Sequence, residues 1–473
     1  MRSAMKVAAV AVSLAVSTLG ALGQENEGRT KGTASMTATS EATPQAGRVF
    51  VPETNQELAG RAHTTYVIRS TDGAKPSGVQ VPMAMSTAGP MATTHEAETP
   101  QSLGCLYVKS PTSAGCVPNY GSGSGGPKPA GYGAIALVDA FDNPNAASDL
   151  AAFDSYWGLP AATFVKIYAN GNGDCTTPPA DAGWSVESSM DIEYAHVFAP
   201  NAAILLVEAC SNSYTDLFYA EQVAFNYIVA NYPAGGQVSN SWLGGEFSGQ
   251  IADDSLFADF NYNWANGYKT PILAFASAGD SGYGVGYPST NPWVISAGGT
   301  SIVRNSTTLK YASESCWGGS GGGPSVVETY VTAFTGGNAG PWANSQYPIF
   351  AKSNRATPDL SFDADPASGA WVYSGYGLGG WGVIGGTSLA SPALAGIINR
   401  AGNKLGSVFL TPVTNGGDFF STWENNLLYS QLATALAYKA NFYDVKTGSN
   451  GHTAVASWDY CTGVGTPRGL LGK

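Results

Sequence analysis

Residues 385–392 read Gly-Gly-Thr-Ser-Leu-Ala-Ser-Pro, and apolar residues at helical spacing follow them as far as Ile398. The pattern predicts a glycine-rich strand end that turns directly into a helix, with Ser388 and Pro392 in its first turns. The amides at a helix N-terminus carry partial positive charge, so they favour an oxyanion that forms beside Ser388. A simple helix cap is the alternative, but a cap needs one hydroxyl residue, whereas glycines here expose the serine.

Short apolar strands alternate with helices upstream of this serine. We expect strands over residues 134–138, 202–207, 237–242 and 271–277, and helices over residues 184–198, 217–228 and 250–265. Continuous apolar strands between helices indicate an α/β fold with a mainly parallel central sheet and helices on both faces. Ligand sites of such sheets lie at the carboxyl ends of the strands, where glycines permit tight turns.

A serine nucleophile needs a proton acceptor, and the histidines do not offer an obvious one. The chain has four of them: His63, His95, His196 and His452. The first two fall in an N-terminal stretch with little regular pattern, and His196 lies inside a predicted helix as a structural residue. We therefore predict that the acceptor is not an imidazole.

Two acids on the helix predicted over residues 184–198 can replace it. Glu187 and Asp191 are four residues apart, so they project from the same face one turn apart. The helix has no Lys or Arg to pair with them. In a partly dry cleft such a pair shares a proton and titrates as a unit. A solvated acidic face is the alternative, and it becomes the weaker one with Ser388 in the same chain.

A third acid follows the strand predicted over residues 271–277. Residues 277–282 read Ser-Ala-Gly-Asp-Ser-Gly. A carboxyl group at a strand end can bind metal, cap a turn or, when protonated, donate a hydrogen bond. A neutral Asp280 could stabilise an oxyanion as an asparagine amide does, and activity would then depend on acid.

Together these segments resemble the sedolisins, the serine-carboxyl peptidases, which share the subtilisin fold and use Glu in place of the His base. The resemblance spans residues 132–469 and rests on several motifs in the same order. They are Glu-x-x-x-Asp-Ile-Glu at 187–193, Ala-Pro at 199–200, Ser-Ala-Gly-Asp-Ser-Gly at 277–282, Tyr-Pro-Ser at 287–289, Gly-Gly-Thr at 298–300, Pro-Asp-Leu at 358–360, Asp-Ala-Asp-Pro at 363–366 and the serine segment. The resemblance implies a subtilisin-like fold and a peptidase that cleaves polypeptides at acidic pH through an acyl-enzyme, as an endopeptidase or as a tripeptidyl-type exopeptidase.

The resemblance also implies a role for each acid. Ser388 attacks the scissile carbonyl, and Glu187 accepts its proton. Asp191 orients Glu187, and Asp280 stabilises the oxyanion. Two further residues, Asp139 and Trp242, match positions that extend the acid network in some members of the family.

One structural Ca²⁺ ion near the C-terminus is implied in the same way. Its ligands would be Asp444, Val445, Val455, Ser457 and Asp459, with backbone oxygens contributed by the residues between the two aspartates. The family often has glycine where this chain has Val455 and Ser457, so the match is weaker at these two positions. Without the resemblance, two aspartates fifteen residues apart would not indicate a metal site.

Composition and the N-terminus indicate a protein outside the cell. Residues 1–23 combine a basic start, a short apolar run and small residues, as a signal peptide does, and no later segment is apolar enough to span a membrane. The charged fraction is 12%, against about 25% in typical soluble proteins. The net charge of -12 argues against a nucleic-acid partner. We expect a secreted, extracellular monomer.

The six cysteines fit this location. They form no Cys-x-x-Cys pair and have no His at ligand spacing, so disulfides are favoured over zinc. About fifteen connectivities are possible for six cysteines. We favour sequence neighbours: Cys105–Cys116, Cys175–Cys210 and, from the remaining two, Cys316–Cys461.

Residues 24–100 are predicted to be a low-complexity linker or a shortened propeptide, with one strand over residues 64–69, ahead of a sedolisin-like peptidase domain at 101–473. Sedolisins usually carry a long folded propeptide that blocks the cleft. A shortened leader, a propeptide from another chain and unaided folding all stay open. The missing propeptide also motivates an alternative function, a catalytically degenerate secreted binding protein on the same scaffold, which an active-site label would distinguish.

Overall fold

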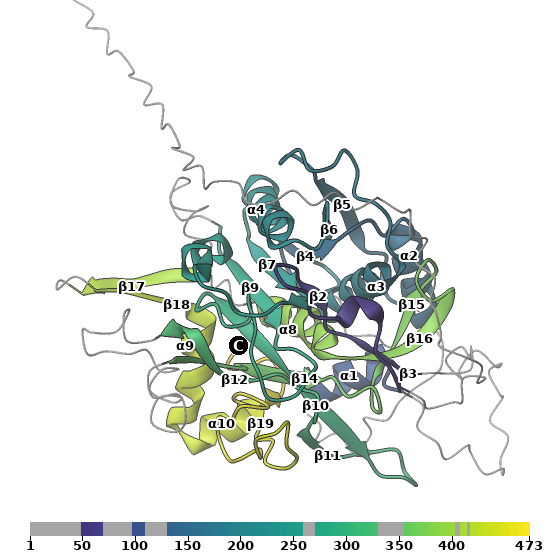
Figure 1. Ribbon diagram of the computed structural model, residues 1–473. Helices are drawn as coiled ribbons and strands as arrows, with labels where there is room; N and C mark the ends of the chain where they lie inside the picture. Colours follow the sequence, from purple (N-terminus) through teal and green to yellow (C-terminus); the bar gives the residue numbers. More distant parts are fainter. Residues whose placement is uncertain are drawn as a thin grey trace, which may run out of the picture. The chain divides into compact units, whose positions relative to one another are not determined.

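The largest sheet has eight strands in the computed structural model, which describes residues 49–69, 97–108, 130–258, 270–329, 354–402, 407–413 and 417–473 (Figure 1). The strand order is β11-β10-β9-β7-β4-β6-β5, and β14 pairs with β10. Every pair is parallel except β10 with β11. The strands are β4 (Ala134–Ala140), β5 (Thr163–Ala169), β6 (Ala203–Ala209), β7 (Gly236–Asn240), β9 (Ile272–Ser277), β10 (Val294–Arg304), β11 (Tyr311–Cys316) and β14 (Leu360–Asp363). The predicted mainly parallel sheet is confirmed.

Helices pack on both faces of this sheet, as predicted. Side chains of β4 alternate between two cores because successive residues of a strand point to opposite faces. Ile135 and Leu137 pack with α3 (Ala182–Phe198) and α8 (Thr387–Ala401), whereas Ala136 packs with α4 (Tyr214–Asn231). The first face also carries α1 (Pro100–Tyr107) and α2 (Ala146–Trp157).

The N-terminal segment departs from the sequence prediction. Residues 49–69 belong to the fold and are not a linker: β1 (Val49–Phe50) and β3 (Val67–Arg69) join β16 (Gly380–Gly385) and β15 (Ala370–Ser374) in an antiparallel sheet. β2 (His63–Thr64) pairs with β8 (Trp242–Leu243). His63 is therefore buried in a strand, with 7% of its surface exposed. This segment has no hydrophobic core of its own, and it is ordered by pairing with strands far away in the sequence. A local sequence pattern does not reveal such pairing.

The helix predicted over residues 250–265 is wrong over its described part. Residues 250–258 form two short 3₁₀ helices, Gln250–Ala252 and Asp254–Phe257, and residues 259–269 lie outside the described residues. The side-chain amide of Asn291 donates to the backbone oxygen of Asp254 at 3.2 Å, and the Tyr287 hydroxyl donates to its carboxylate at 3.1 Å. Tertiary hydrogen bonds thus replace the ones an α-helix would make.

The remaining elements lie around residues 323–357 and in the C-terminal part. They are β12 (Gly323–Thr329), β13 (Asn354–Thr357), β17 (Ser407–Val413), β18 (Gly417–Thr422), α9 (Trp423–Ser430), α10 (Ala435–Asn441), β19 (Phe442–Tyr443) and β20 (Thr466–Pro467). Within the described residues, no helix has the length and apolar character needed to cross a membrane.

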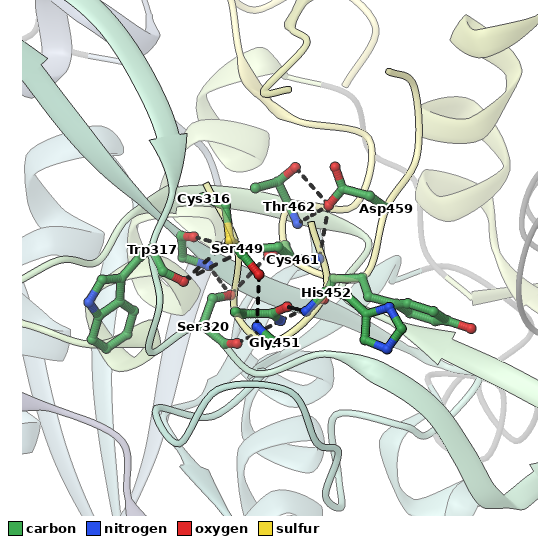
Figure 2. Close-up of a disulfide and its surroundings, with 12 residues drawn as sticks. Cys316, Trp317, Ser320, Ser449, Gly451, His452, Asp459, Cys461 and Thr462 are labelled. Atoms are coloured by element: carbon green, nitrogen blue, oxygen red, sulfur yellow. Dashed lines mark hydrogen bonds between the residues drawn. A yellow bond between two sulfur atoms is a disulfide. The ribbon is translucent and has the colours of Figure 1, made fainter. Parts of the chain in front are cut away.

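Two predicted disulfides are confirmed. Cys175 pairs with Cys210, and Cys316 pairs with Cys461 across 145 residues of sequence. Figure 2 shows the second, which ties the end of β11 to the loop that carries Asp459 and Thr462. Cys105 is also disulfide-bonded, but its predicted partner Cys116 lies outside the described residues.

Candidate active site

The carboxyl ends of three parallel strands bring the predicted residues to one edge of the sheet. Asp139 lies near the end of β4, Ser241 directly follows β7, and Asp280 lies three residues after β9. Asp139 continues the alternation that points Ile135 and Leu137 toward α3 and α8. These two helices carry the remaining groups, Glu187 and Asp191 on α3 and Ser388 on α8.

Ser388 is the second residue of α8 and is fully buried. Its hydroxyl donates to the backbone oxygen of Ser241 at 3.1 Å, and the Ser241 hydroxyl donates to the Ser388 backbone oxygen at 3.2 Å. The backbone N–H of Ser388 donates to the carbonyl oxygen of Thr65 at 2.9 Å. An amide in the first turn of a helix has no partner within the helix, so the Ser388 N–H can donate to an oxygen from elsewhere, as it does to Thr65.

The residue that precedes this helix must be glycine. Gly386 has φ +110°, in the region that side chains rarely adopt. A Cβ atom at this position would lie 2.3 Å from the Thr65 carbonyl oxygen and 2.5 Å from Oδ2 of Asp280. Both oxygens therefore pack closely against the α-carbon of Gly386, beside the first amides of α8.

Three carboxyl groups form a buried acid cluster beside Ser388: Glu187, Asp191 and Asp139. Among the described residues, no hydrogen bond of normal geometry reaches their side-chain oxygens. Burial, and next the charge of Asp139, raise the pKa of Glu187 and of Asp191 well above their usual values. Burial raises the pKa of Asp139 to about 8. The cluster therefore holds protons at acidic and neutral pH.

Asp280 is partly exposed, but its Oδ2 atom is buried close to Gly386. Its Oδ1 accepts hydrogen bonds from the Thr387 backbone N–H at 2.8 Å and from the Thr387 hydroxyl at 2.9 Å. Its Oδ2 has no hydrogen-bond partner among the described residues. Burial raises the pKa of Asp280 to about 8, against the lowering effect of the two Thr387 donors. Below that pH the carboxyl group is neutral, and Oδ2 can carry a proton to donate.

Trp242 has no free polar atom to contribute to the acid cluster. Its indole N–H donates to the backbone oxygen of Val138 at 3.0 Å. This contact lies on the backbone of β4, at the residue that precedes Asp139.

The described histidines are all bound elsewhere. The Nδ1 atom of His63 lies 2.9 Å from the backbone oxygen of Thr64, and His196 Nε2 lies 2.8 Å from the backbone oxygen of Pro160. The His452 ring packs against Tyr283. His95 lies outside the described residues. His196 is the structural residue that the sequence predicts.

Sequence reasoning missed three residues that contact the site. Ser241 stands at the end of a predicted strand, and its position at the sheet edge is the signal that could have identified it. Thr387 directly precedes the serine in the quoted segment, and its hydroxyl also accepts from the Gly279 N–H at 2.9 Å. Thr65 has no local signal, because only the tertiary fold brings it to Ser388.

The predicted calcium ligands lie in one loop. The backbone N–H of Ser457 donates to Asp444 at 2.9 Å, and that of Val455 donates to Asp459 at 3.0 Å. Ser457 has φ +72°, a conformation that favours glycine. The backbone at this position therefore has the conformation expected of a glycine, although the residue is a serine. Within the described residues, no group of three or more His, Cys, Asp and Glu side chains could hold a metal. Any ion here would need backbone oxygens beside the two carboxylates, and this donor set suits Ca²⁺.

Comparison with known proteins identifies the family. The subtilase family profile matches residues 166–415. The chain is 29% identical over 345 residues to kumamolisin of Bacillus sp. (strain MN-32), covering 68% of this chain and 56% of kumamolisin. It is 27% identical over 354 residues to sedolisin of Pseudomonas sp. (strain 101), covering 67% of this chain and 53% of sedolisin. The chain thus spans about half the length of these curated relatives.

A solved structure is also similar. It is Pseudomonas sedolisin, a serine-carboxyl proteinase, complexed with two molecules of pseudo-iodotyrostatin. The two structures align with a TM-score of 0.57 and 22% identity, over 79% of this chain and 96% of that one. This likeness supports the fold. The predicted resemblance to the sedolisins is confirmed.

Proposed function

Because the chain belongs to the subtilase family, we propose that it is a serine-carboxyl endopeptidase that cleaves polypeptides at acidic pH. The observation that carries this proposal is the buried acid cluster beside Ser388, with no described histidine bonded to that serine. A serine nucleophile needs a proton acceptor, and carboxylates are the groups that this site offers.

In the proposed mechanism, Ser388 attacks the scissile carbonyl and passes its proton to Glu187 in those molecules in which the cluster leaves Glu187 ionised. Asp191 shares a proton with Glu187 and orients it, and Asp139 is the third acid of the same cluster. The Ser388 N–H and the protonated Oδ2 of Asp280 stabilise the oxyanion. Glu187 then gives its proton to the leaving amine, and water hydrolyses the acyl-enzyme.

The pH profile of hydrolysis tests this proposal. Wild type should cleave an unfolded protein from about pH 3 to about pH 7 and lose activity as Asp280 loses its proton near pH 8. In Asp280→Ala the donor is gone, and we expect about 10² to 10³ lower kcat at every pH. Asp280→Asn keeps a neutral donor at all pH values, so it should retain more activity than Asp280→Ala on the alkaline side. Equal losses in the two variants would refute the oxyanion role, and an alkaline optimum in wild type would refute acid peptidase function.

The protein is proposed to act outside the cell, as a monomer. Two disulfides in the described residues are consistent with an oxidising compartment. The predicted signal peptide, residues 1–23, lies outside the described residues. Mass spectrometry of the culture supernatant, with size-exclusion chromatography, checks both statements; a protein retained in the cytoplasm would contradict the first.

We also propose that the loop of residues 444–459 binds one Ca²⁺ ion as a structural element. Asp444 and Asp459 would hold the ion together with backbone oxygens of Val445, Val455 and Ser457, and the ion would add positive charge between two carboxylates.

Calcium removal tests this site. If calcium is present at about 100 times its Kd, an excess of EGTA should lower Tm by about 3 °C, and added Ca²⁺ should restore it. The Asp444→Asn variant should have this lower Tm in the absence of EGTA, and its Tm should not change when EGTA is added. An unchanged wild-type Tm in EGTA would contradict the proposal.

A further inference from the structure

The Asp280 loop, residues 278–284, follows β9 and carries the proposed oxyanion donor. Gly279 and Gly282 within it have φ +108° and φ +78°, in the region that side chains rarely adopt. Glycine loses more backbone freedom on folding than any other residue, so contacts from outside the loop must fix its shape. The place of the Asp280 carboxyl group therefore depends on the neighbours of this loop.

A glycine-rich turn, residues 317–323, holds the backbone of the Asp280 loop on both sides of the acid. The N–H of Gly321 donates to the carbonyl oxygen of Gly279 at 2.7 Å, directly before the acid. The N–H of Gly282 donates to the carbonyl oxygen of Gly319 at 2.8 Å, two residues after it. A displacement of the turn would therefore displace the carboxyl group as well.

Asn450 joins the glycine-rich turn to the Asp280 loop and is buried, with 4% of its surface exposed. Its carbonyl oxygen accepts from the Tyr283 N–H at 2.6 Å. Its side-chain amide donates to the carbonyl oxygens of Ser320 at 2.9 Å and Tyr460 at 3.1 Å. Its side-chain oxygen accepts from the His452 N–H at 3.1 Å. One residue is thus bonded to the loop, to the turn and to the C-terminal part of the chain.

The C-terminal part is well anchored beside this turn. Cys461 forms the disulfide with Cys316, and its carbonyl oxygen accepts from the Ser320 hydroxyl at 2.9 Å. The ring of His452 packs against the ring of Tyr283, with 4.2 Å between their centroids. Figure 2 shows the disulfide together with Ser320 and His452. The support for the Asp280 loop is therefore fixed both covalently and by hydrogen bonds.

We infer that Asn450 is a positioning residue for catalysis, which holds the Asp280 loop so that Oδ2 of Asp280 lies where the oxyanion forms. The inference rests on the proposed function. The two Thr387 donors hold Oδ1 from the side of α8, and Asn450 holds the backbone of the loop from the other side. A donor stabilises an oxyanion only at about 2.7 to 3.1 Å from it, so a small displacement of the loop removes the contact.

Asn450→Ala tests the inference. The substitution removes the two side-chain N–H donors and leaves the backbone carbonyl that Tyr283 uses, so the loop is loosened but not detached. We expect kcat at the acid optimum to fall about 10-fold to 10²-fold, less than the fall expected for Asp280→Ala. The KM should stay within about threefold of wild type, because the oxyanion exists in the transition state and not in the bound substrate. Initial rates over a range of substrate concentrations measure both values.

A double variant shows whether the effect passes through Asp280. If Asn450 acts by positioning that carboxyl group, adding Asn450→Ala to Asp280→Ala should change kcat by less than about threefold, since the contact is already lost. Independent structural damage would instead multiply the two reductions. Multiplied reductions, or a higher KM with an unchanged kcat, would overturn the inference.

Asn399→Ala is the matched control. Asn399 is fully buried, and its side-chain amide donates to the Tyr132 carbonyl oxygen at 2.9 Å and to the Gln237 side chain at 2.7 Å. Its side-chain oxygen accepts from the Tyr132 N–H at 2.9 Å, so the number of hydrogen bonds matches that of the Asn450 side chain. It lies near the end of α8 and does not contact the Asp280 loop. Its loss should lower Tm to a similar extent and leave kcat within about threefold of wild type. An equal fall in kcat in both variants would overturn the inference.

The same assays separate this inference from the proposed function. An active wild type and an Asn450→Ala variant with the same kcat overturn the inference and leave the proposed function standing. A wild type that does not cleave an unfolded protein at acidic pH contradicts both. If Asn450→Ala does not fold, Asn450→Ser keeps one side-chain donor and should show a smaller fall in kcat at the same KM. A wild-type kcat in that variant would overturn the inference.

Discussion

Ser388→Ala is expected to lower kcat on an unfolded protein substrate by about 10⁴-fold to 10⁶-fold. The variant removes the only atom that can form the acyl-enzyme in the proposed mechanism. The oxyanion donors stay in place, so a residual rate above that of water is expected. The side chain loses one oxygen in a buried position, and the fold should survive. The measurement is initial rates at the acid optimum, with thermal unfolding to check the fold.

The matched control is Ser391→Ala. Ser391 lies one turn further along α8, is equally buried and is bonded to Ser239 and not to Ser388. Its loss removes one neutral hydrogen bond, worth about 1 kcal/mol of stability, and should leave kcat within about tenfold of wild type. If both variants lose activity equally, helix damage and not nucleophile loss is the cause. If Ser388→Ala stays active, another group carries the reaction.

The sequence pointed to the candidate catalytic residues because each lies in a segment with its own local signal. Glu187 and Asp191 share one helix face, which follows from the helical period alone. Asp280 and Ser388 follow glycine-rich strand ends, and parallel strands bring such ends to one edge. The structure brings these residues together as that reasoning expects, with Asp139 added by the alternation along β4.

What the sequence could not show depends on pairings between distant segments. Thr65 reaches Ser388 only because β2 pairs with a strand about 180 residues later and β3 with one about 310 residues later. The 3₁₀ turns at residues 250–257 form because Asn291 and Tyr287 bond to Asp254. Neither effect leaves a periodic pattern in the chain. The N-terminal segment therefore resembled a linker although its backbone is paired on both sides.

The acid dependence proposed for this site would follow from burial more than from residue type. The carboxyl groups of Glu187, Asp191 and Asp139 have no basic side chain hydrogen-bonded to them among the described residues, and each has a raised pKa. Folding favours their protonated forms, so they stabilise the protein below about pH 4 and lose this contribution as pH rises toward 8. Burial also raises the pKa of Asp280 to about 8, so the proposed oxyanion donor loses its proton in the same pH range. Stability and the oxyanion site should therefore decline together as pH rises.

Glu187→Gln is expected to lower kcat by about 10²-fold to 10⁴-fold at the acid optimum. Glutamine keeps the shape of the side chain and fits a buried, neutral position, but it cannot accept the Ser388 proton. Asp191 is then the one acid of the Glu187/Asp191 pair that can still accept a proton. Because the charge of Glu187 raises the pKa of Asp191, the substitution should also lower that pKa, and the residual activity should shift to lower pH. Rates across the acid range measure both effects.

Glu193→Gln separates the base from a merely buried acid. Glu193 lies on the same helix, is fully buried and has a pKa raised well above its usual value, chiefly by burial. Its oxygens accept from the Tyr373 N–H at 3.2 and 3.3 Å, a contact with β15 and not with Ser388. A glutamine there can keep that hydrogen bond, so kcat should stay within about tenfold of wild type. A similar loss in both variants would mean that helix α3 needs acids for packing. A loss confined to Glu187→Gln assigns proton transfer to the one acid of the two that lies next to the serine.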